Sequence, residues 1–333
     1  EKYTDYRKML DRKDIDAVTV STPDHNHAPA AMKAIKQGKH AFVQKPLSKT
    51  VFEARTLREA AKKHKVATQM GNQGTSTSGL RKGVEVIQSG GIGDVTEIHV
   101  WTNRPVWPQG SKAIPRAPKS SPVPGHMDWS SWLGPAADRD YSSKYLPFVW
   151  RGFWDFGTGA LGDMACHTAN LAFMACELQH PVAIQREEMV GNNEITYPTY
   201  SKIRFDFPAR KSSRIKDKTL PALKFFWYDG WTIKGGRKTY NTPPKETFQG
   251  QPIKPSNSGS LMIGDKGMMY SPNDYGSGWR LYPDEFAKDY KAPTPWIDRS
   301  PGHAQEWIRA CKGGKPAMSN FDYAALLTET ILL

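Results

Sequence analysis

The sequence predicts an α/β protein with a doubly wound parallel sheet, followed by a second α/β domain with a large, mostly antiparallel open sheet. Two observations lead to this fold class. In the first 90 residues, strand patterns alternate with helical patterns, and strands joined by helical crossovers run parallel. Later strand patterns follow one another without helices, which indicates antiparallel pairing. We expect domains over residues 1–92 and 93–302 and a helical segment over 303–333.

Strands and helices alternate clearly in the first domain. The β-branched run Ile15–Ser21 ends at a Thr-Pro pair, and apolar residues then recur at helical spacing until Gly38. Thr50 and Glu53 have the spacing of a capping box, which predicts the start of a second helix. The expected elements are strands over 15–21, 40–43 and 66–70 and helices over 28–38 and 50–64.

Polar residues follow each of these three strands. They are Thr22 and Pro23, then Gln44, Lys45 and Pro46, then Asn72 and Gln73. Because ligands of open parallel sheets bind beyond the carboxyl ends of the strands, these residues are expected to line one crevice. The alternative is that strand ends are simply where loops and polar residues belong. Lys45 favours a crevice, since a lysine between a strand and a proline has little freedom.

A long irregular segment over residues 103–150 follows an expected strand over 95–102. It contains eight prolines. Segments this long in compact proteins are usually functional, and a disordered linker would be poor in aromatic residues, so we expect a packed lid. The tryptophans in or beside it are Trp101, Trp107, Trp129, Trp132 and Trp150. Further strands are expected over 183–190, 202–207, 224–228 and 260–270, the last with a turn at 264–267.

The stretch Gly157–Gly162 fits the dinucleotide-binding pattern G-x-G-x-x-G. That pattern has physical meaning only after a buried strand, and no strand pattern precedes these glycines. We therefore expect them to open a helix of the second domain, remote from any pyrophosphate. This helix, expected over 159–178, has no lysine, arginine or glutamate between Asp163 and Glu177, which predicts burial on most sides.

Asp163, His167 and Asn170 form one polar stripe along this helix. A carboxylate four residues from an imidazole can hold one ring nitrogen by a hydrogen bond and leave the other nitrogen to exchange a proton. That is the geometry of a general base with its orienting group. The alternative is an incidental polar pair satisfied within the core.

Composition excludes several other classes of function. The net charge is +13 and the basic residues are scattered, so without a nucleic-acid motif we expect no nucleic-acid partner. Cys166, Cys176 and Cys311 form no C-x-x-C pair, which predicts buried thiols. No run of 18 apolar residues occurs, so no membrane span is expected. The His25-x-His27 pair lacks further ligands, and we expect no metal site.

Several of these motifs together resemble those of a known family. Thr22-Pro23 with His27, then Gln44-Lys45-Pro46, then Gly159 with Asp163-x-x-x-His167 are similar in order and spacing to the glucose-fructose oxidoreductase and inositol dehydrogenase family, Gfo/Idh/MocA. The resemblance spans nearly the whole chain. It implies a Rossmann domain that binds NAD or NADP and a second domain with a large open sheet that holds a sugar or cyclitol.

The resemblance also implies roles for individual residues. His167, oriented by Asp163, would take a hydroxyl proton, while Lys45 would stabilise charge on the same oxygen. The catalytic residues would be Lys45, Asp163 and His167, and the cofactor would be lined by Thr22, Pro23, His27, Gln44, Lys45 and Asn72. Residues expected at the substrate are Arg104, Trp150, Arg151 and Asp163.

Two features depart from the family pattern. In the family, the dinucleotide-binding pattern G-x-G-x-x-G lies in a first strand–helix unit of the Rossmann domain. This chain is expected to begin after that unit, so the sequence predicts a truncated Rossmann domain. Gln44 stands where the family usually has glutamate, which removes a negative charge beside Lys45.

The most direct expectation is an NAD(P)-dependent oxidoreductase that acts on a ring hydroxyl of a sugar, glycoside or cyclitol. Lid tryptophans would stack on sugar C–H faces, and Arg104 and Arg151 would meet hydroxyl groups. Two alternatives stay open: a redox-assisted glycoside hydrolase, and a non-catalytic regulator that binds nucleotide or sugar. The resemblance further implies a homo-oligomer through the open sheet. The expected compartment is the cytoplasm, or the periplasm if an export signal precedes Glu1.

Overall fold

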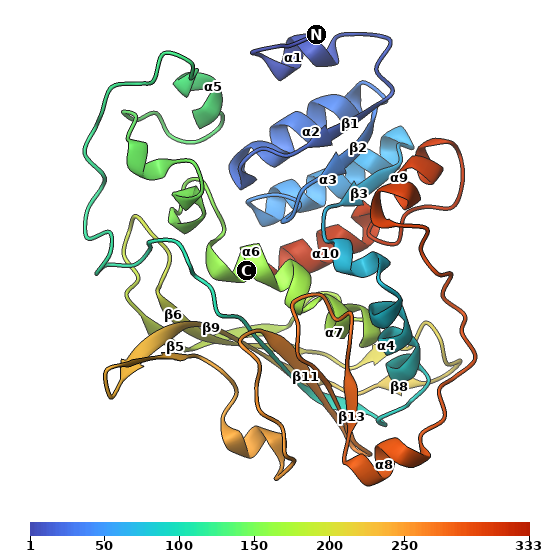
Figure 1. Cartoon of the computed structure of the whole chain (residues 1–333). Helices are drawn as coiled ribbons and strands as arrows, with labels where there is room; N and C mark the ends of the chain where they lie inside the picture. The colour runs from blue at the N-terminus through green and yellow to red at the C-terminus, as the bar shows by residue number, and fades with distance from the viewer.

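The computed structural model describes residues 1–333, and its first three strands form one parallel sheet of order β1-β2-β3. These strands are β1 (Ala17–Val20), β2 (His40–Val43) and β3 (Thr68–Met70). The crossovers between them are α2 (His27–Lys36) and α3 (Val51–His64), which pack against each other, while α1 (Tyr6–Leu10) precedes β1 (Figure 1). The predicted parallel arrangement is confirmed.

The capping box predicted from Thr50 and Glu53 is present at the start of α3. The Thr50 hydroxyl oxygen accepts a hydrogen bond from the Glu53 amide at 3.2 Å, and the Glu53 carboxylate accepts one from the Thr50 amide at 3.0 Å. Two amides that have no partner inside the helix are thereby satisfied. This cap fixes the path of the chain just after Lys45.

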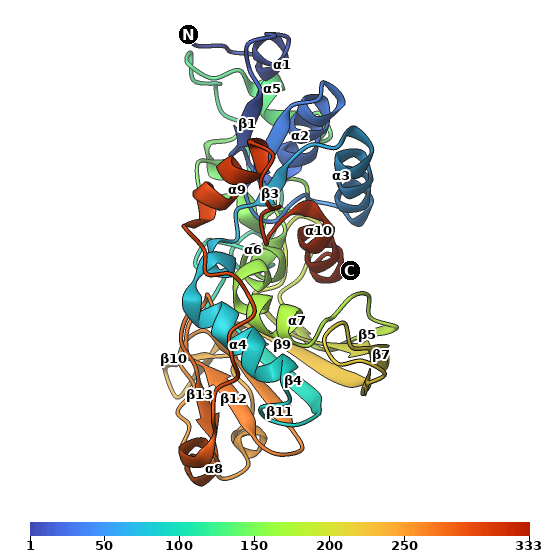
Figure 2. The ribbon, with the colours of Figure 1, turned by 90° about the vertical axis from the view of Figure 1, so that its right-hand side faces the viewer.

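An eight-stranded sheet forms the second part of the molecule, with strand order β13-β12-β11-β4-β9-β6-β5 and β10 paired to β9 (Figure 2). Only β4 and β9 run parallel, so the predicted mostly antiparallel sheet is confirmed. The bounds are β4 (Val95–Trp101), β5 (Ala183–Val190), β6 (Tyr200–Phe207), β9 (Leu223–Lys234), β10 (Arg237–Tyr240), β11 (Gly259–Gly264), β12 (Met268–Ser271) and β13 (Arg280–Tyr282). β7 (Arg210–Lys211) and β8 (Thr219–Leu220) form a separate ribbon.

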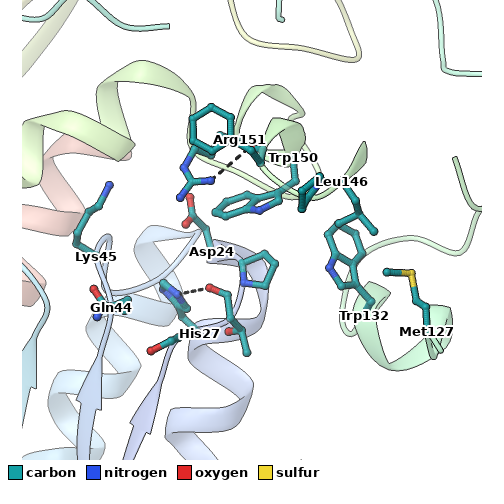
Figure 3. A pocket seen from close by; sticks show the side chains of 14 residues that line it. Asp24, His27, Gln44, Lys45, Met127, Trp132, Leu146, Trp150 and Arg151 are labelled. Carbon is teal, nitrogen blue, oxygen red and sulfur yellow. Dashed lines mark hydrogen bonds between the residues drawn. The ribbon is translucent and has the colours of Figure 1, made fainter. Parts of the chain in front are cut away.

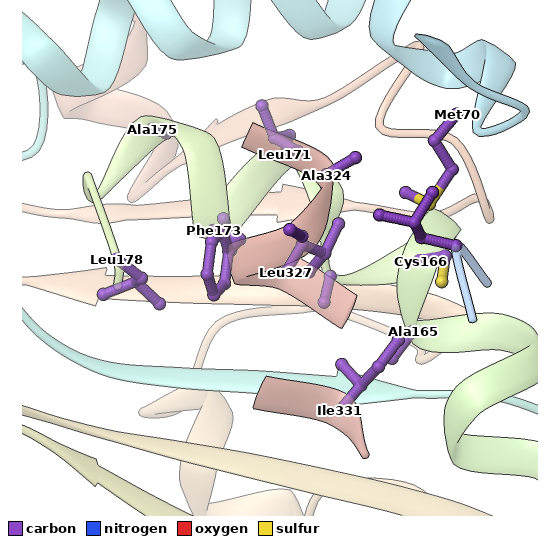
Figure 4. Close-up of a cluster of buried hydrophobic side chains, with 14 of the residues drawn as sticks. Met70, Ala165, Cys166, Leu171, Phe173, Ala175, Leu178, Ala324, Leu327 and Ile331 are labelled. Carbon is purple, nitrogen blue, oxygen red and sulfur yellow. The ribbon is translucent and has the colours of Figure 1, made fainter. Parts of the chain in front are cut away.

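Helices between the two sheets carry the main core. They are α4 (Ser78–Gln88), α6 (Gly159–Thr168), α7 (Asn170–Ala175) and α10 (Phe321–Ile331). Leu171 and Phe173 of α7 and Ala324 and Leu327 of α10 belong to one cluster of buried side chains, part of which Figure 4 shows. The helix predicted over 159–178 is interrupted at Ala169, which divides α6 from α7. As predicted, nearly every residue of α6 is buried.

The segment between β4 and α6 packs around an aromatic cluster of its own. It contains α5 (Trp129–Leu133) and short 3-10 turns at Ser143–Tyr145 and Val149–Gly152. Trp129 and Trp132 stack with ring centroids 5.0 Å apart, and both lie near Phe156. Aromatic packing therefore gives this long, proline-rich segment a defined shape.

The end of the chain returns to the first sheet. After α8 (Asp284–Asp289), α9 (His303–Cys311) lies beside β3, and α10 packs against α3. The Met70 amide donates a hydrogen bond to the Ser319 carbonyl at 2.9 Å, which ties β3 to the residues before α10. None of the helices combines the length and the apolar character needed to cross a bilayer.

Candidate active site

A cavity of about 650 Å³ lies where the carboxyl ends of β1 and β2 meet the segment before α6 (Figure 3). One wall carries side chains from the first sheet, and the facing wall carries side chains from residues 127–151. The lining residues are Ser21, Thr22, Pro23, Asp24, His27, Gln44, Lys45, Met127, Trp132, Leu146, Pro147, Phe148, Trp150 and Arg151. The cavity thus occupies the place expected for the ligand of an open parallel sheet.

Lys45 joins the two parts of the molecule at this cavity. Its Nζ donates hydrogen bonds to the Asp163 carboxylate at 2.6 Å and to the Asp163 carbonyl at 2.7 Å. Both side chains are mostly buried, with 17% of the Lys45 side chain and 10% of the Asp163 side chain exposed. Charge-assisted hydrogen bonds of this length are stronger than neutral ones, so the pair holds the ammonium group in one position.

Arg151 is a second cation on the same carboxylate. Its Nε donates to the Asp163 carboxylate at 3.2 Å, and its guanidinium lies over the rings of Trp150 and Phe148 at 4.3 and 4.8 Å. Burial pushes the pKa of Asp163 upward, but attraction to Lys45 and Arg151 outweighs it and leaves that pKa below its usual value. Asp163 is therefore ionised at neutral pH.

His167 lies one turn after Asp163, but the hydrogen bond predicted between them does not form. The Asp163 carboxylate is turned toward Lys45 and Arg151, and the Nδ1 atom of His167 is buried without a partner. Burial, together with the charge of Lys45, lowers the pKa of His167 to about 3, so its ring is neutral. The ring meets Tyr275 edge-on at 5.2 Å. Neither Asp163 nor His167 is among the residues that line the cavity.

The expected cofactor residues divide into two groups. Thr22, Pro23, His27 and Gln44 line the cavity with Lys45. The ring nitrogens of His27 lie 2.7 Å from the Pro46 carbonyl and 2.9 Å from the Thr22 carbonyl, so this side chain connects the loops after β1 and β2. Asn72 does not reach the cavity: it is fully buried and donates to the Cys166 carbonyl at 3.4 Å.

The expected substrate residues divide in the same way. Trp150 and Arg151 line the cavity, together with Trp132. Arg104 does not line it; its guanidinium hydrogen-bonds to Asn103, and its charge helps to lower the pKa of His167. Trp101 lies in the core of the large sheet, and Trp107 is also buried. Of the five tryptophans singled out in the sequence, two therefore face the cavity.

Asp24 is a site residue that the sequence analysis missed. It lines the cavity with a carboxyl group that is almost fully buried, and it accepts a hydrogen bond from the Thr158 hydroxyl at 2.8 Å. Burial, and secondarily the charge of Asp163, raise the pKa of Asp24 to about 7. An acidic residue directly after the Thr-Pro pair at a strand end was the signal that could have identified it.

The glycines at 157–162 open a helix and do not follow a buried strand, as predicted. A 3-10 turn at Val149–Gly152 precedes them. Gly159 begins α6 with a φ of +63°, and a side chain at this position would meet the Tyr197 ring. The backbone conformation and the close approach of Tyr197 therefore both require a glycine here.

His25 packs among backbone carbonyl groups of the segment before α6. Its ring nitrogens lie 3.2 Å from the Phe156 carbonyl oxygen and 2.9 Å from the Trp132 carbonyl oxygen. No cluster of metal-binding residues is present in the chain. His25 thus connects the turn after β1 to the aromatic cluster.

Two models of one oxidoreductase family match the chain. Residues 1–72 match its NAD-binding Rossmann fold, and residues 94–208 match its C-terminal α/β domain. Together these matches cover more than half of the chain. The cavity described above lies between the two matched regions.

Curated relatives match parts of the chain. Levoglucosan dehydrogenase of Pseudarthrobacter phenanthrenivorans is 27% identical over 169 residues, which are 51% of this chain and 35% of that protein. Glycosyl hydrolase family 109 protein 1 of Shewanella sp. strain ANA-3 is 48% identical over 58 residues, which are 17% of this chain and 13% of that protein. The chain thus spans well under half the length of each of these relatives.

Solved structures share the fold over nearly the whole chain. Aldose-aldose oxidoreductase from Caulobacter crescentus aligns over 98% of this chain and 78% of its own, with a TM-score of 0.55 and 16% identity. Levoglucosan dehydrogenase in complex with NADH and levoglucosan aligns over the same shares, with a TM-score of 0.56 and 17% identity. At such identities the likeness concerns the fold alone. With both family models matched in order, the chain belongs to the Gfo/Idh/MocA family of oxidoreductases.

Proposed function

We propose that this protein is a nicotinamide-dependent oxidoreductase that oxidises a hydroxyl group of a sugar or glycoside. The observation that carries the proposal is the buried ion pair of Lys45, in the NAD-binding region, with Asp163 of α6. The Nζ atom of Lys45 lies 2.6 Å from a carboxylate oxygen of Asp163. A cation held at the edge of a cavity is suited to stabilise negative charge that develops on a hydroxyl oxygen. Levoglucosan dehydrogenase, a sugar-oxidising relative, supports the same substrate class.

The residues at the cavity fit a nicotinamide dinucleotide. Thr22, Pro23 and His27 follow β1, and Gln44 and Lys45 follow β2, so five lining residues lie at the carboxyl ends of parallel strands. The buried Nδ1 atom of His167 has no partner within the chain, and buried polar atoms in proteins nearly always have one. The chemistry that the dinucleotide supplies when bound is acceptance of a hydride.

The protein's own residues would manage the proton and the charge. The ammonium group of Lys45 lies beside the ionised Asp163 carboxylate and would donate a hydrogen bond to the substrate oxygen. His167 is neutral, so its free nitrogen would accept the hydroxyl proton. Asp163 would orient Lys45 and, through its charge, stabilise the imidazolium that forms.

A neutral sugar ring suits the wall formed by the segment before α6. Trp132 and Trp150 face the cavity and offer flat apolar surfaces on which C–H faces stack. Arg151 already has partners in Asp163 and the Phe148 carbonyl, so it is not a free cation for an acidic substrate. These features favour a neutral sugar or glycoside over an acidic one.

A second candidate function is redox-assisted hydrolysis of a glycosidic bond. It is favoured by the 48% identity to a glycosyl hydrolase family 109 protein over 58 residues, which is higher than the identity to the dehydrogenase. In that case transient oxidation of a ring hydroxyl to a ketone would assist cleavage of the glycosidic bond by elimination. The cofactor would then return to its oxidised form when the ketone is reduced again. A regulator that binds nucleotide without turnover is the non-enzymatic alternative.

One screen tests these functions against each other. The full-length native protein is incubated with NAD or NADP and with sugars, cyclitols, glycosides, aliphatic alcohols or amino acids. Reduction of the cofactor by sugars or cyclitols supports the dehydrogenase. Release of free aglycone without net cofactor reduction supports the hydrolase, and tight nucleotide binding without any turnover supports the regulator. Reduction only by aliphatic alcohols or amino acids would refute the sugar proposal.

We also propose the domain limits 1–92 and 93–302, with the helical segment 303–333 packed on the first domain, and a homo-oligomer formed through the open sheet. β5 at the sheet edge is largely exposed, and Val182, Ile184 and Val190 leave apolar surface there. Size-exclusion chromatography with light scattering would test the oligomer, and a monomeric mass at micromolar concentration would contradict it.

A further inference from the structure

Asp24 is a buried carboxyl group of the cavity that the proposed mechanism does not use. It belongs to the turn Asp24–Asn26 after β1, while its hydrogen-bond donor, Thr158, is the residue immediately before α6. Thr158 makes no capping hydrogen bond to its own helix and gives its hydroxyl to Asp24 instead. The carboxyl group is thus held between the NAD-binding region and the helix that carries Asp163.

The charged groups that face Asp24 come from three other elements. Asp163 of α6 raises its pKa, while Lys45 after β2 and Arg151 of the turn before α6 lower it. Tyr197 and Cys166, whose pKa values also respond to the charge of Asp24, both stay neutral because burial raises their pKa values. The four charged groups are those of Asp24, Asp163, Lys45 and Arg151. Their net charge is zero when both carboxylates are ionised and +1 when Asp24 is protonated.

Oxidation of a hydroxyl by a nicotinamide changes this local charge. The C–H bond gives its electron pair to the oxidised ring as hydride, the O–H bond gives up a proton, and a C=O bond forms. The ring loses its positive charge in the process, while the proton remains to be placed. His167 is a poor final holder of this proton, because burial beside Lys45 keeps its ring neutral at ordinary pH and lowers its pKa to about 3.

We propose that Asp24 is the residue that holds the proton released in the reaction, so that the charge of the cavity is the same before and after hydride transfer. The geometry supports this assignment. Asp24 lines the same cavity as Lys45, is shielded from solvent and has a single hydrogen-bond donor, so its second carboxyl oxygen is available for a proton. A pKa near neutrality, as found for Asp24, suits a group that exchanges a proton under working conditions.

The inference rests on the proposed function, and it predicts a linkage that is visible without turnover. A positively charged oxidised ring in the cavity favours ionised Asp24, and a neutral reduced ring favours protonated Asp24. The ratio of the dissociation constants for NAD and NADH should therefore rise as pH falls near neutrality, by up to about tenfold per pH unit. If the native protein prefers NADP, the same ratio is measured with NADP and NADPH.

Binding calorimetry of the full-length protein between about pH 5.5 and 8.5, in buffers of different ionisation enthalpy, measures both the ratio and the proton uptake. Asp24→Asn, which is isosteric and can still accept from Thr158, should make the ratio independent of pH. Thr158→Val keeps the carboxyl group but removes its hydrogen-bond donor, so the transition should move to higher pH. Asp155→Asn, at a half-exposed carboxylate shortly before Thr158, should leave the wild-type slope unchanged.

The outcomes separate the inference from the function on which it rests. A ratio in the wild type that does not change with pH, or a slope that survives Asp24→Asn, would overturn the inference and leave the proposed function intact. A protein that binds neither nucleotide at any pH would overturn the proposed function and the inference with it. The inference is supported if the ratio no longer depends on pH in Asp24→Asn and if its pH transition lies at higher pH in Thr158→Val. A purely structural role of Asp24 would not produce these two different effects on the pH dependence.

Discussion

Lys45 and Asp163 are 118 positions apart in the sequence, yet the ammonium nitrogen of one lies 2.6 Å from the carboxylate oxygen of the other. The contact is made because Lys45 follows β2 and Asp163 lies in the second turn of α6, and the two elements meet at the cavity. A buried ion pair is costly to break on one side only, since an unpaired buried charge remains. The first prediction therefore concerns the removal of Lys45 alone.

Lys45→Met should lower turnover by about 10²- to 10⁴-fold, the range expected when charge stabilisation at the reacting oxygen is lost. It should also raise the pKa of Asp163, because the charge of Lys45 is a main reason that this pKa is low. Steady-state kinetics and thermal unfolding at several pH values would measure both effects. Lys49→Met, a change at a lysine that does not line the cavity, is the matched control. Equal turnover in the two variants would contradict the role proposed for Lys45.

His167→Asn should reduce turnover by about 10²-fold or more while leaving nucleotide affinity nearly unchanged, since only the proton acceptor is removed. The comparison is between kcat and the dissociation constant of the nucleotide, measured separately. His180→Asn, at a half-exposed histidine on the outside of the molecule, should change neither quantity. If His167→Asn retained wild-type kcat, another group would have to accept the proton.

Asp229→Asn should stabilise the protein above neutral pH. Burial raises the pKa of Asp229 to about 6, although Trp227 and Ser201 both donate hydrogen bonds to its carboxylate. In the wild type, the contribution of Asp229 to stability is most favourable where its carboxyl group is protonated in both folded and unfolded states, and this contribution falls as pH rises from about 4 to 6. The variant lacks this loss, so its advantage should reach roughly 3 kcal/mol at about pH 8 and shrink near pH 4. Chemical unfolding at both pH values measures the difference, and an equal effect at both would contradict the assigned pKa.

Trp132→Ala and Trp150→Ala should each raise KM for a sugar substrate more than they lower kcat, because both side chains line the cavity and neither takes part in the hydrogen bonds of Lys45 and Asp163. The loss of stacking on one aromatic face corresponds to roughly 1 kcal/mol, or about fivefold in KM. Trp231→Ala in β9, which lies on the large sheet away from the cavity, serves as the reference. Unchanged KM in both cavity variants would show that the tryptophans only pack the segment before α6.

Local sequence signals predicted the fold well, and long-range partners in the site were harder to predict. The capping box at Thr50 and Glu53 involves residues three apart, so composition and spacing suffice to identify it. The hydrogen bond predicted between Asp163 and His167 was wrong, because spacing along a helix does not reveal that Lys45 and Arg151 compete for the carboxylate.

Asp24 and Asn72 illustrate the same difficulty at the ends of the strands. Both follow strands of the parallel sheet, and the sequence favoured Asn72 as a cavity residue. Only the packing of α6 decides between them: Asn72 is covered by the Cys166 backbone, whereas Asp24 lies at the cavity and meets Thr158. Contacts between residues about 100 positions apart are set by the assembled fold and leave no periodic signal.

The return of α10 to the first sheet has a consequence for how the protein is made. β3 packs against α9 and α10, and α3 packs against α10, so these partners are synthesised long after β3 and α3 themselves. Contacts between segments so distant in sequence slow folding, and the exposed sheet is prone to association in the meantime. Nascent chains should therefore depend on chaperones until α10 emerges.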